Sequence, residues 1–437
     1  MENDEIISRI GANSLGEISE VIYGTTPEGG VFEDEGVPFI RSQNFYDHII
    51  SSDYVFCTNK FHIEHENSKC LPRDLLFAAI GATIGDFAIV PTWINEANTN
   101  QNIARVRINS QKYRAEYVWA FFLSQYGQLQ LHRYPTGNAQ PYLNTYQFNR
   151  LKIPFIKNQE KFTQLVQDIF KLIESSDRLY PEAEQELLKR MEWDKVTTNH
   201  RLSYSATSKD ILTDERLDPE FYQPKFENLE KHLKKVGSLA IEKVCNFVNH
   251  GIQPPYFENG TVSVVTQKEM TPTFLELESI KDFTSADFYN ENPDFKLKKH
   301  DVLLYSVGAY IGRCNILLDE IKAMAGSYVT ILRANGDFIV PEYLALFLNS
   351  TAGVLQSRQQ MRGTAQHYLY PRDIKKIKVF IPRDKNGKPD LAWQKKLAAK
   401  VIQANEAKKF AQQKLQEAKE LVEQEIEKLM IDQRTVI

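Results

Sequence analysis

Cysteine is scarce in this sequence, and none of it stands in the spacing of a metal site. The 437 residues contain four cysteines (Cys57, Cys70, Cys245 and Cys314), widely separated and without a CxxC pair. This argues against a structural zinc and fits a reducing compartment. No apolar run approaches the roughly 18 residues needed to span a bilayer, and Met1–Arg9 is polar, without a signal-peptide core. We therefore expect a cytoplasmic protein with no membrane association.

Positive charge is not in excess either. The 53 Lys and Arg are outnumbered by 57 Asp and Glu, so the formal net charge is −4. A protein that coats DNA non-specifically is usually basic, and any DNA binding here must depend on local patches. The length favours two or three domains over one.

Motifs of catalysis are also missing. The chain has no GxxxxGK[ST] phosphate loop, no HExxH zinc motif and no GxSxG nucleophile elbow. One string, Gln253-Pro-Pro-Tyr256, resembles the [ND]PP[YF] loop with which amino-methyltransferases grip the target amine. Gln replaces Asn or Asp in it, and no glycine-rich cofactor loop accompanies it, so a surface turn is the better interpretation. We expect no catalytic residue, no metal ligand and no cofactor in this chain.

What the sequence does contain is a long internal repeat. Leu71–Val90 (LPRDLLFAAIGATIGDFAIV) resembles Leu297–Ile316 (LKKHDVLLYSVGAYIGRCNI), and both glycines of the first block lie 227 positions before their counterparts. Tyr117 and Tyr343 begin similar segments 226 positions apart, and VPFIRSQNF corresponds more loosely to VSVVTQKEM. Solenoid units are only roughly 20–50 residues long, so this period indicates duplication of a whole domain.

Each copy is expected to have an α+β fold. The short apolar runs LLFAAIG and VLLYSVG, and the runs IARVRIN and YVTILRA, indicate strands. The amphipathic stretches EYVWAFFLSQYGQLQL and EYLALFLNSTAGVLQS each predict a helix.

A long helix is predicted after each copy. Apolar residues recur at spacings of three and four from Phe162 to Met191 and from Leu397 to Leu429, which is a heptad-like stripe. Because a helix with one apolar stripe needs a partner, we expect the two helices to pack as an antiparallel coiled coil. Pro181 lies within the first stripe and should kink that helix or end it.

The domain boundaries follow from these patterns, with Val196–Asp210, rich in Ser, Thr and Asn, serving as a linker. We expect a first domain at 1–156, a first spacer helix at 157–195, a linker and short helix at 196–236, a second domain at 237–390 and a second spacer helix at 391–437.

Two basic segments at matching positions are the best candidates for a binding site. Gln128–Lys157 contains four Arg and Lys and no acidic residue, and Ser357–Arg383 contains seven against Asp373 alone, giving charges of +4 and +6. Arg and Lys neutralise phosphates, while Arg, Asn and Gln can contact guanine or adenine edges in the major groove. Either segment alone could be a solvated basic face, but their joint placement favours DNA.

The duplicated order resembles the specificity subunit of type I restriction–modification systems. The resemblance is carried by the strand–glycine blocks, by the segments PTGNAQPYLN and MRGTAQHYLYPRDIKKIKVFIP, by the helix after each copy, and by Arg216–Lys225 (RLDPEFYQPK) ahead of the second domain. It covers nearly the whole chain, although no copy of RLDPEFY precedes the first domain.

The resemblance implies two target-recognition domains, each reading one half of a split target in double-stranded DNA. The paired helices would fix the gap between half-sites and dock two methyltransferase subunits, which restriction and translocase subunits join. It implies no activity for this chain alone, with S-adenosylmethionine, ATP and Mg held by the partner subunits. The residues placed at the DNA are polar ones of the turns and basic segments: Thr25, Thr26, Arg41, Gln43, Asn44, Thr83, Arg133, Asn138 and Gln140 in the first domain, and His250, Gln253, Gln267, Lys268, Tyr310, Arg358, Arg362, Thr364, Gln366 and His367 in the second.

Three alternatives stay open from the sequence. The chain could serve a related type II system, whose partner joins modification and cleavage in one polypeptide, and the neighbouring genes would decide. It could be an enzyme with its own recognition domains, which the missing cofactor and metal motifs oppose. It could be a coiled-coil scaffold without DNA readout, which leaves the basic segments unexplained.

Overall fold

Two units make up the chain, Met1–Glu174 with Lys408–Ile437, and Ser175–Ala407. The computed structural model describes residues 7, 10–81, 83–136, 141–308, 310–363 and 366–434. Residues 432–434 are described by their backbone alone. Within these ranges, no helix is both long and apolar enough to cross a membrane.

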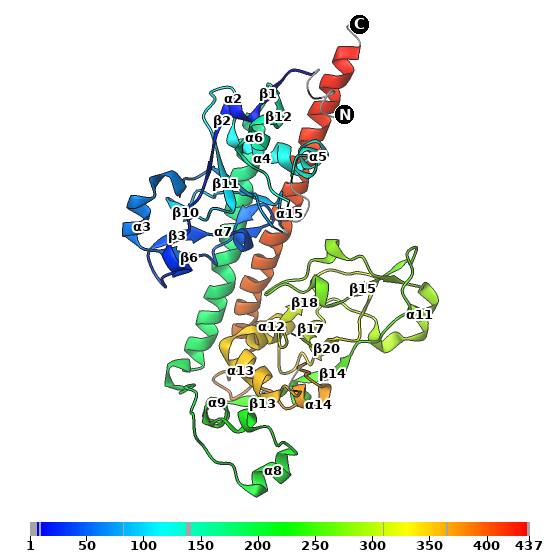
Figure 1. Cartoon of the computed structure of the whole chain (residues 1–437). Helices are drawn as coiled ribbons and strands as arrows, with labels where there is room; N and C mark the ends of the chain where they lie inside the picture. Colours follow the sequence, from blue (N-terminus) through cyan, green and yellow to red (C-terminus); the bar gives the residue numbers. More distant parts are fainter. Residues whose placement is uncertain are drawn as a thin grey trace. The chain divides into compact units, whose positions relative to one another are not determined.

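The first unit is built around a six-stranded sheet (Figure 1, blue to cyan). Its strand order is β2 (Ser19–Tyr23), β11 (Ile103–Ile108), β8 (Leu75–Ala78), β9 (Phe87–Ile89), β5 (Ile49–Ile50), β4 (Phe45–Tyr46). A second sheet has the order β6 (Val55–Cys57), β3 (Val37–Ile40), β10 (Ala97–Thr99), β7 (Lys69–Cys70), and a third pairs β1 (Ala12–Ser14) with β12 (Lys152–Pro154). The helices are α2 (Leu15–Ile18), α3 (Asn59–Glu64), α4 (Ala115–Leu123), α5 (Gln125–Arg133), α6 (Thr145–Arg150), the first part of α7 (Glu160–Arg190) and the last part of α15 (Leu391–Arg434).

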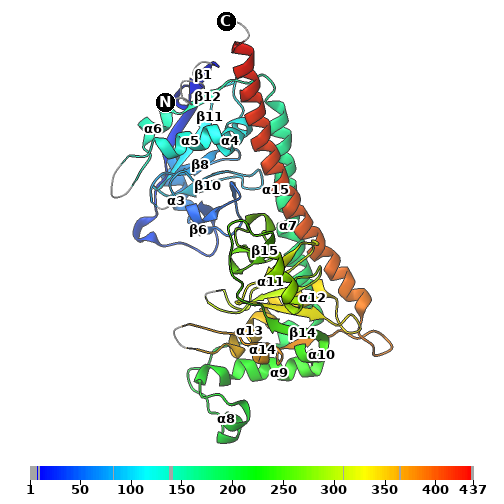
Figure 2. The same ribbon diagram turned by 90° about the vertical axis from the view of Figure 1, so that its right-hand side faces the viewer.

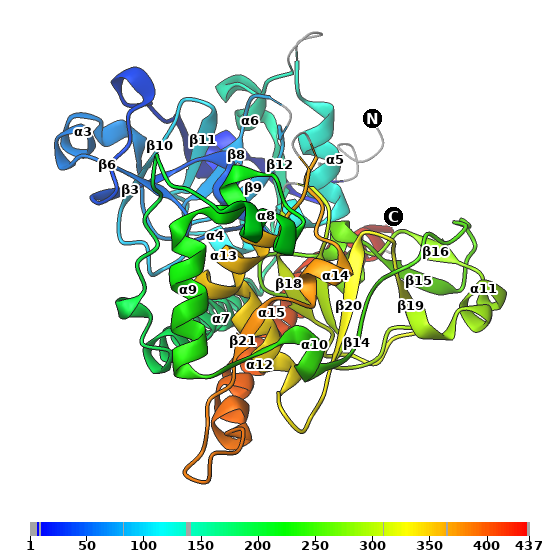
Figure 3. The same ribbon diagram turned by 90° about the horizontal axis from the view of Figure 1, so that it is seen from below.

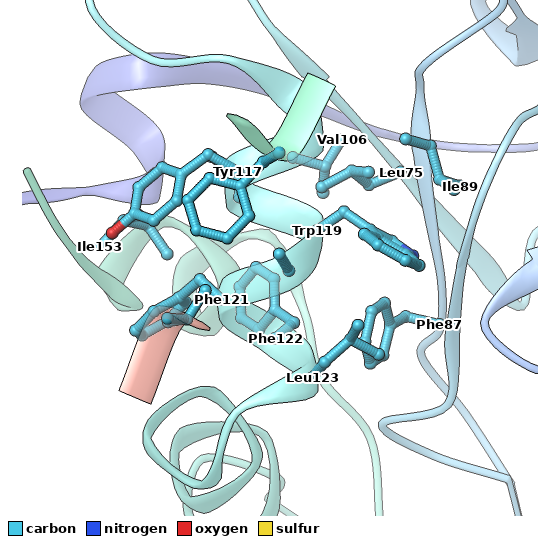
Figure 4. Close-up of a cluster of buried hydrophobic side chains, with 14 of the residues drawn as sticks. Leu75, Phe87, Ile89, Val106, Tyr117, Trp119, Phe121, Phe122, Leu123 and Ile153 are labelled. Atoms are coloured by element: carbon cyan, nitrogen blue, oxygen red, sulfur yellow. The ribbon is translucent and has the colours of Figure 1, made fainter. Parts of the chain in front are cut away.

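Helix α4 fills the core of this unit because nearly all its residues are apolar and buried. Trp119 and Phe122 are fully buried and lie close to Leu75 and Phe87 of the main sheet (Figure 4). Burying a side chain of this size contributes about 2 kcal/mol or more. The sheet is therefore held firmly from one face, which fixes the positions of the strand ends.

The second unit repeats this architecture (Figure 1, green to orange). Its main sheet has the order β14 (Cys245–His250), β20 (Val329–Ala334), β17 (Val302–Tyr305), β18 (Cys314–Ile316). Its second sheet has the order β16 (Phe283–Thr284), β15 (Val262–Val265), β19 (Ala323–Ala325). Its third sheet pairs β13 (Ser238–Ala240) with β21 (Lys378–Phe380). The helices are α8 (Ser208–Asp214), α9 (Pro224–Val236), α10 (Ile241–Val244), α11 (Ala286–Glu291), α12 (Pro341–Asn349), α13 (Thr351–Gln360), α14 (Pro371–Ile374), and parts of α7 and α15 (Leu391–Arg434).

The two units share strand order and pairing. The β2–β11–β8–β9 run of the first unit corresponds to β14–β20–β17–β18 of the second. The one parallel pairing of each second sheet also recurs, between β3 and β10 and between β15 and β19. The predicted α+β duplication is therefore confirmed, and it extends to the part ahead of the first glycine block, where the sequence match is loose.

A buried ion pair at equivalent positions shows how close the duplication is. Arg107 Nε donates to Asp74 Oδ1 at 2.8 Å, and Arg333 Nε donates to Asp301 Oδ1 at 3.0 Å. Both aspartates are 2% exposed, and each accepts from a backbone N–H three residues upstream. The pair ties the loop before β8 or β17 to the neighbouring strand.

Each of the two amphipathic stretches forms two helices where one was expected. The break between α4 and α5 is at Ser124, and that between α12 and α13 is at Ser350. Each hydroxyl donates to the carbonyl three residues before it, at 2.6 Å, and also accepts from the backbone of the next helix. A serine that satisfies both ends in this way competes with a continuous helix.

Helix α7 runs without interruption from Glu160 to Arg190, so the expectation that Pro181 might end it is wrong. A proline inside a helix removes one backbone hydrogen bond. Burial of Tyr180, Ala183 and Leu187 on either side of the proline keeps the helix in place.

The predicted antiparallel packing of the two long helices is found in each unit (Figure 2). In the first unit, Ile169 and Ile173 of α7 share a core with Val422 and Ile426 of α15. In the second, Glu182 Oε2 lies 3.1 Å from Lys400 Nζ, and Glu186 Oε2 lies 2.8 Å from Lys396 Nζ. The residue numbers in α15 fall as those in α7 rise, so the two helices run antiparallel. The prediction that the two long helices pack as an antiparallel coiled coil is therefore confirmed within each unit.

Candidate nucleic-acid interface

In the second unit, loops from several strand ends meet along one edge of the main sheet. The segment after α13 forms a hairpin in which Arg362 and Tyr368 exchange backbone hydrogen bonds of 2.8 Å. The hairpin docks onto the end of β17, because Leu369 N donates to Ser306 O at 2.9 Å and Gly308 N donates to His367 O at 3.3 Å. The basic segment and the glycine block of the second copy are thus brought together.

This edge contains a cleft lined by three of the predicted residues, Tyr310, Arg358 and His367. Tyr310 is 58% exposed. The Arg313 guanidinium lies over its ring at 4.2 Å and donates to Met270 O at 3.3 Å. Burial lowers the pKa of Arg313, yet its guanidinium stays cationic at neutral pH. Aromatic and guanidinium groups held in this way can contact base edges or phosphates.

Two other loops extend the same edge. Gln267, at the start of the turn after β15, donates to Val307 O at 2.9 Å. Gln253 Oε1 accepts from Ser327 Oγ at 3.0 Å. His250, the last residue of β14, bonds through Nδ1 to Thr330 Oγ1 at 2.8 Å. Burial lowers the pKa of His250, so at neutral pH it is a neutral hydrogen-bonding group.

Lys268 and Gln366 complete the second unit's predicted set. Lys268 is on the exposed side of the turn after β15 and binds Asp282 at 2.8 Å. Gln366 is exposed in the hairpin and accepts from the Tyr368 hydroxyl at 2.8 Å.

The first unit presents an equivalent edge. Thr25 N donates to Thr99 O at 2.8 Å, and the side chain of Thr26 bonds to Gln101. Gly24 precedes them at a point where a Cβ atom would lie 2.1 Å from Thr99 O, so only glycine fits. The counterpart Gly251 has the same constraint, 2.2 Å from Ala325 O, which confirms that the two loops are equivalent.

The remaining residues of the first edge are contributed by three loops. Arg41 follows β3, and its guanidinium lies 5.5 Å from the Phe32 ring centroid, with Nε lacking a hydrogen-bond partner among the described residues. Gln43 is exposed in the same turn, and Thr83 is exposed in the turn between β8 and β9. Arg133 is exposed at the end of α5.

Leu143 N donates to Ala79 O at 2.9 Å and so docks the basic segment of the first copy, as in the second unit. Asn138, Gln140 and Thr364 lie outside the described residues.

Comparison with known families bears on the first of these two edges. Residues 12–185 match the model described as "Type I restriction modification DNA specificity domain". Over this region, which is less than half of the chain, the sequence is similar to that DNA specificity domain. The match supports the DNA-specificity role that the sequence predicted. The second unit lies largely outside this match, and its main sheet repeats the β2–β11–β8–β9 order of the first unit as β14–β20–β17–β18.

Solved structures give similar matches. The S subunit of a type I restriction–modification system from M. genitalium matches over 96% of this chain and 95% of its own, with a TM-score of 0.49 and 12% identity. The HsdS subunit from Thermoanaerobacter tengcongensis matches over 96% of both chains, with a TM-score of 0.30 and 17% identity. At these TM-scores they add nothing to the assignment by family. No curated protein matches the chain.

Two further predicted residues are held by contacts within their own units. Asn44 is fully buried, and its amide holds the turn by bonding to Arg41 N and Asp53 O. Arg362 binds Asp373 through Nε and Nη2 at 2.7 and 3.0 Å. Asn44 is buried, and the Arg362 side chain is only 22% exposed and held by Asp373, so we leave both out of the proposed DNA contacts.

The sequence analysis missed two residues of the second edge. Tyr328 is 54% exposed, and its carbonyl accepts from Gln267 and Ser306. Arg313 follows the second glycine of its block directly. A signal for Arg313 was present, because the first copy has Asp86 at the equivalent position, so the charge reverses between the copies.

Proposed function

We propose that this chain is the specificity subunit of a type I restriction–modification complex and reads a split target in double-stranded DNA. Each unit would read one half with the edge described above. We place the recognition domains at 1–156 and 237–390, with spacer helices at 157–195 and 391–437. The observation that carries the proposal is the duplication: a domain that matches the DNA specificity family is followed by a second of the same strand order.

The contacting residues in this proposal are polar residues of the two edges that are exposed or partly exposed. They include Thr25, Thr26, Arg41, Gln43, Thr83 and Arg133 in the first unit, and His250, Gln253, Gln267, Lys268, Tyr310, Arg358, Gln366 and His367 in the second. Cations would neutralise phosphates, and amides, Tyr310 and the neutral His250 would meet base edges.

Catalysis is assigned to partner subunits. Methyltransferase subunits would bind S-adenosylmethionine, and restriction and translocase subunits would bind ATP and Mg, while this chain supplies recognition alone. All four cysteines are free thiols, which suits a protein acting on DNA in the cytoplasm. A partner that fuses modification and cleavage, as in a related type II system, is the less favoured alternative.

Methylation mapping tests the proposal. The DNA of cells that contain this chain and the neighbouring methyltransferase gene would be compared with that of cells from which the chain is deleted. We expect a split adenine-methylated motif that disappears on deletion, and Arg358→Ala should weaken methylation. An unchanged methylome without a split motif would contradict the proposal and favour a scaffold.

A further inference from the structure

The segment ahead of the second recognition domain is packed against the recognition edge of its own unit. Arg216–Tyr222 ends in a short turn at Pro219–Tyr222, and α9 follows and packs beside α13 (Figure 3). Gln359, in the last turn of α13, donates to Phe221 O at 3.3 Å. By sequence alone this stretch is a linker, but its contacts are those of a part of the domain.

Arg216 is the centre of these contacts. It is 3% exposed, unusually low for an arginine. Its Nε and Nη2 donate to the two carboxylate oxygens of Asp218 at 2.7 and 2.6 Å, and its guanidinium lies 4.5 Å from the Phe221 ring centroid. The Tyr222 hydroxyl donates to Arg216 O at 2.9 Å. The side chain is therefore fixed in one position by its own segment.

The remaining donors of Arg216 reach the end of α13. Nη1 donates to Gln360 O at 3.2 Å and Nη2 donates to Met361 O at 2.6 Å. Gln360 is the last residue of α13 and Met361 its C-cap. The last carbonyls of a helix have no partner within it, and a cation is favourable there. Arg216 supplies both the hydrogen bonds and the charge.

The contacts of Arg216 with the end of α13 bear on DNA recognition, because the hairpin of the second edge begins there. Arg362, which follows Met361 directly, is the first residue of the hairpin that exchanges bonds with Tyr368 and carries Gln366 and His367. Arg358 lies one turn earlier on α13 and lines the cleft. Arg362 is fixed from the other side by Asp373. The hairpin thus leaves α13 at a point that Arg216 defines.

We propose that Arg216 is a positioning residue for base reading by the second unit. It does not meet DNA, because it is buried, and acts by fixing the direction in which the hairpin leaves α13. A binding group must be held within about 0.5 Å of its working position to discriminate. This inference rests on the proposed function, since it needs the second edge to read one half-site.

The test measures discrimination instead of overall activity. The purified chain with its methyltransferase partner would methylate synthetic duplexes that carry the motif found by mapping. Matched duplexes would have a single base changed in one half or the other. For each half, the ratio is the methylation rate of the unchanged duplex divided by that of the duplex with the changed base. In Arg216→Ala we expect the ratio to fall about tenfold in one half only, the size of one bidentate base contact. That half should be the one in which Arg358→Ala also lowers the ratio.

Two further variants separate positioning from folding. Arg201→Ala removes an exposed arginine of the same linker, whose bonds to Gln223 come from its backbone, and should leave both ratios unchanged. Asp218→Asn keeps Arg216 but weakens its bidentate partner, and should lower the same ratio less than Arg216→Ala. If Arg216→Ala does not fold, Asp218→Asn still tests whether Arg216 positions the hairpin.

The outcomes are distinct. A role in stability alone reduces the amount of active complex and scales all rates together, so unchanged ratios in Arg216→Ala and Asp218→Asn would overturn the inference. Equal loss in both halves would overturn it too. If the wild-type complex methylates no split motif, the proposed function itself fails, and the inference fails with it.

Discussion

At the scale of single residues, the ion pair of Asp74 with Arg107 is a contact whose loss should be costly. Asp74 accepts from Arg107 at 2.8 and 2.7 Å and from Leu71 N at 2.7 Å. The Asp74 side chain is 3% exposed, whereas that of Arg107 is 33% exposed and can be partly solvated. We expect Asp74→Ala to lower the free energy of unfolding by about 2–3 kcal/mol.

Urea denaturation followed by circular dichroism measures this effect. Asp86→Ala, in the same unit and exposed, is the matched control and should change stability by less than about 0.5 kcal/mol. Similar midpoints for the two variants would show that the pair does not hold the loop.

His250 gives a prediction about pH. Burial lowers its pKa in the folded protein, while an unfolded histidine has a pKa of about 6.5. The unfolded chain therefore binds a proton first as the pH falls, and stability attributable to His250 is present above about pH 6.5 and decreases below it. His250→Gln should reduce the fall in Tm between pH 7.5 and pH 5. Parallel Tm curves for the variant and the wild type would exclude this role.

Residue types at the two edges could be predicted better than residue roles. The turns and the basic segments indicated Tyr310, Arg358 and His367, which line one cleft. The same reasoning selected Asn44 and Arg362, because composition cannot separate an amide or cation that faces solvent from one that binds its own fold. The buried pairs were not predicted, although Asp74 and Asp301 stand at the repeat spacing of 227.

At the scale of elements, the apolar stripe of the long helices should contribute more stability than their ion pairs. Leu187 of α7 is fully buried in one core with Leu397 and Val401 of α15. Leu187→Ala should cost about 2–5 kcal/mol. Lys400 binds Glu182 and Glu186 at the surface, and Lys400→Ala should cost less than about 1 kcal/mol. Chemical denaturation of both variants measures the difference, and equal costs would contradict it.

Strands and long helices were predictable because their patterns have one period over many residues. The strands β8, β11, β17 and β20 lie where the apolar runs placed them. The helix breaks at Ser124 and Ser350 were not predictable, because a single serine hydroxyl causes each break within an otherwise unbroken amphipathic pattern. Pro181 shows the opposite case, in which packing outweighs a local signal against a helix.

At the scale of the whole molecule, charge is distributed unevenly. The basic segments Gln128–Lys157 and Ser357–Arg383 carry +4 and +6, so the rest of a chain of net charge −4 carries −14. Phosphate contacts dominate affinity for DNA, and acidic surface elsewhere opposes close approach of the duplex. The chain has the means to discriminate bases but little excess charge with which to bind strongly.

We therefore expect the isolated chain to bind a duplex containing its motif weakly, with a Kd of roughly 10⁻⁴–10⁻⁶ M at physiological salt, the range of non-specific binding. Addition of the methyltransferase partner should tighten binding by about 100-fold or more and steepen the dependence of log K on log salt, because the partner would supply further phosphate contacts. Fluorescence anisotropy between 50 and 200 mM KCl, with and without the partner, gives both quantities, and a duplex of scrambled sequence is the control. Nanomolar binding by the isolated chain at 150 mM would mean that the two edges, with their few cations, supply the affinity as well as the specificity.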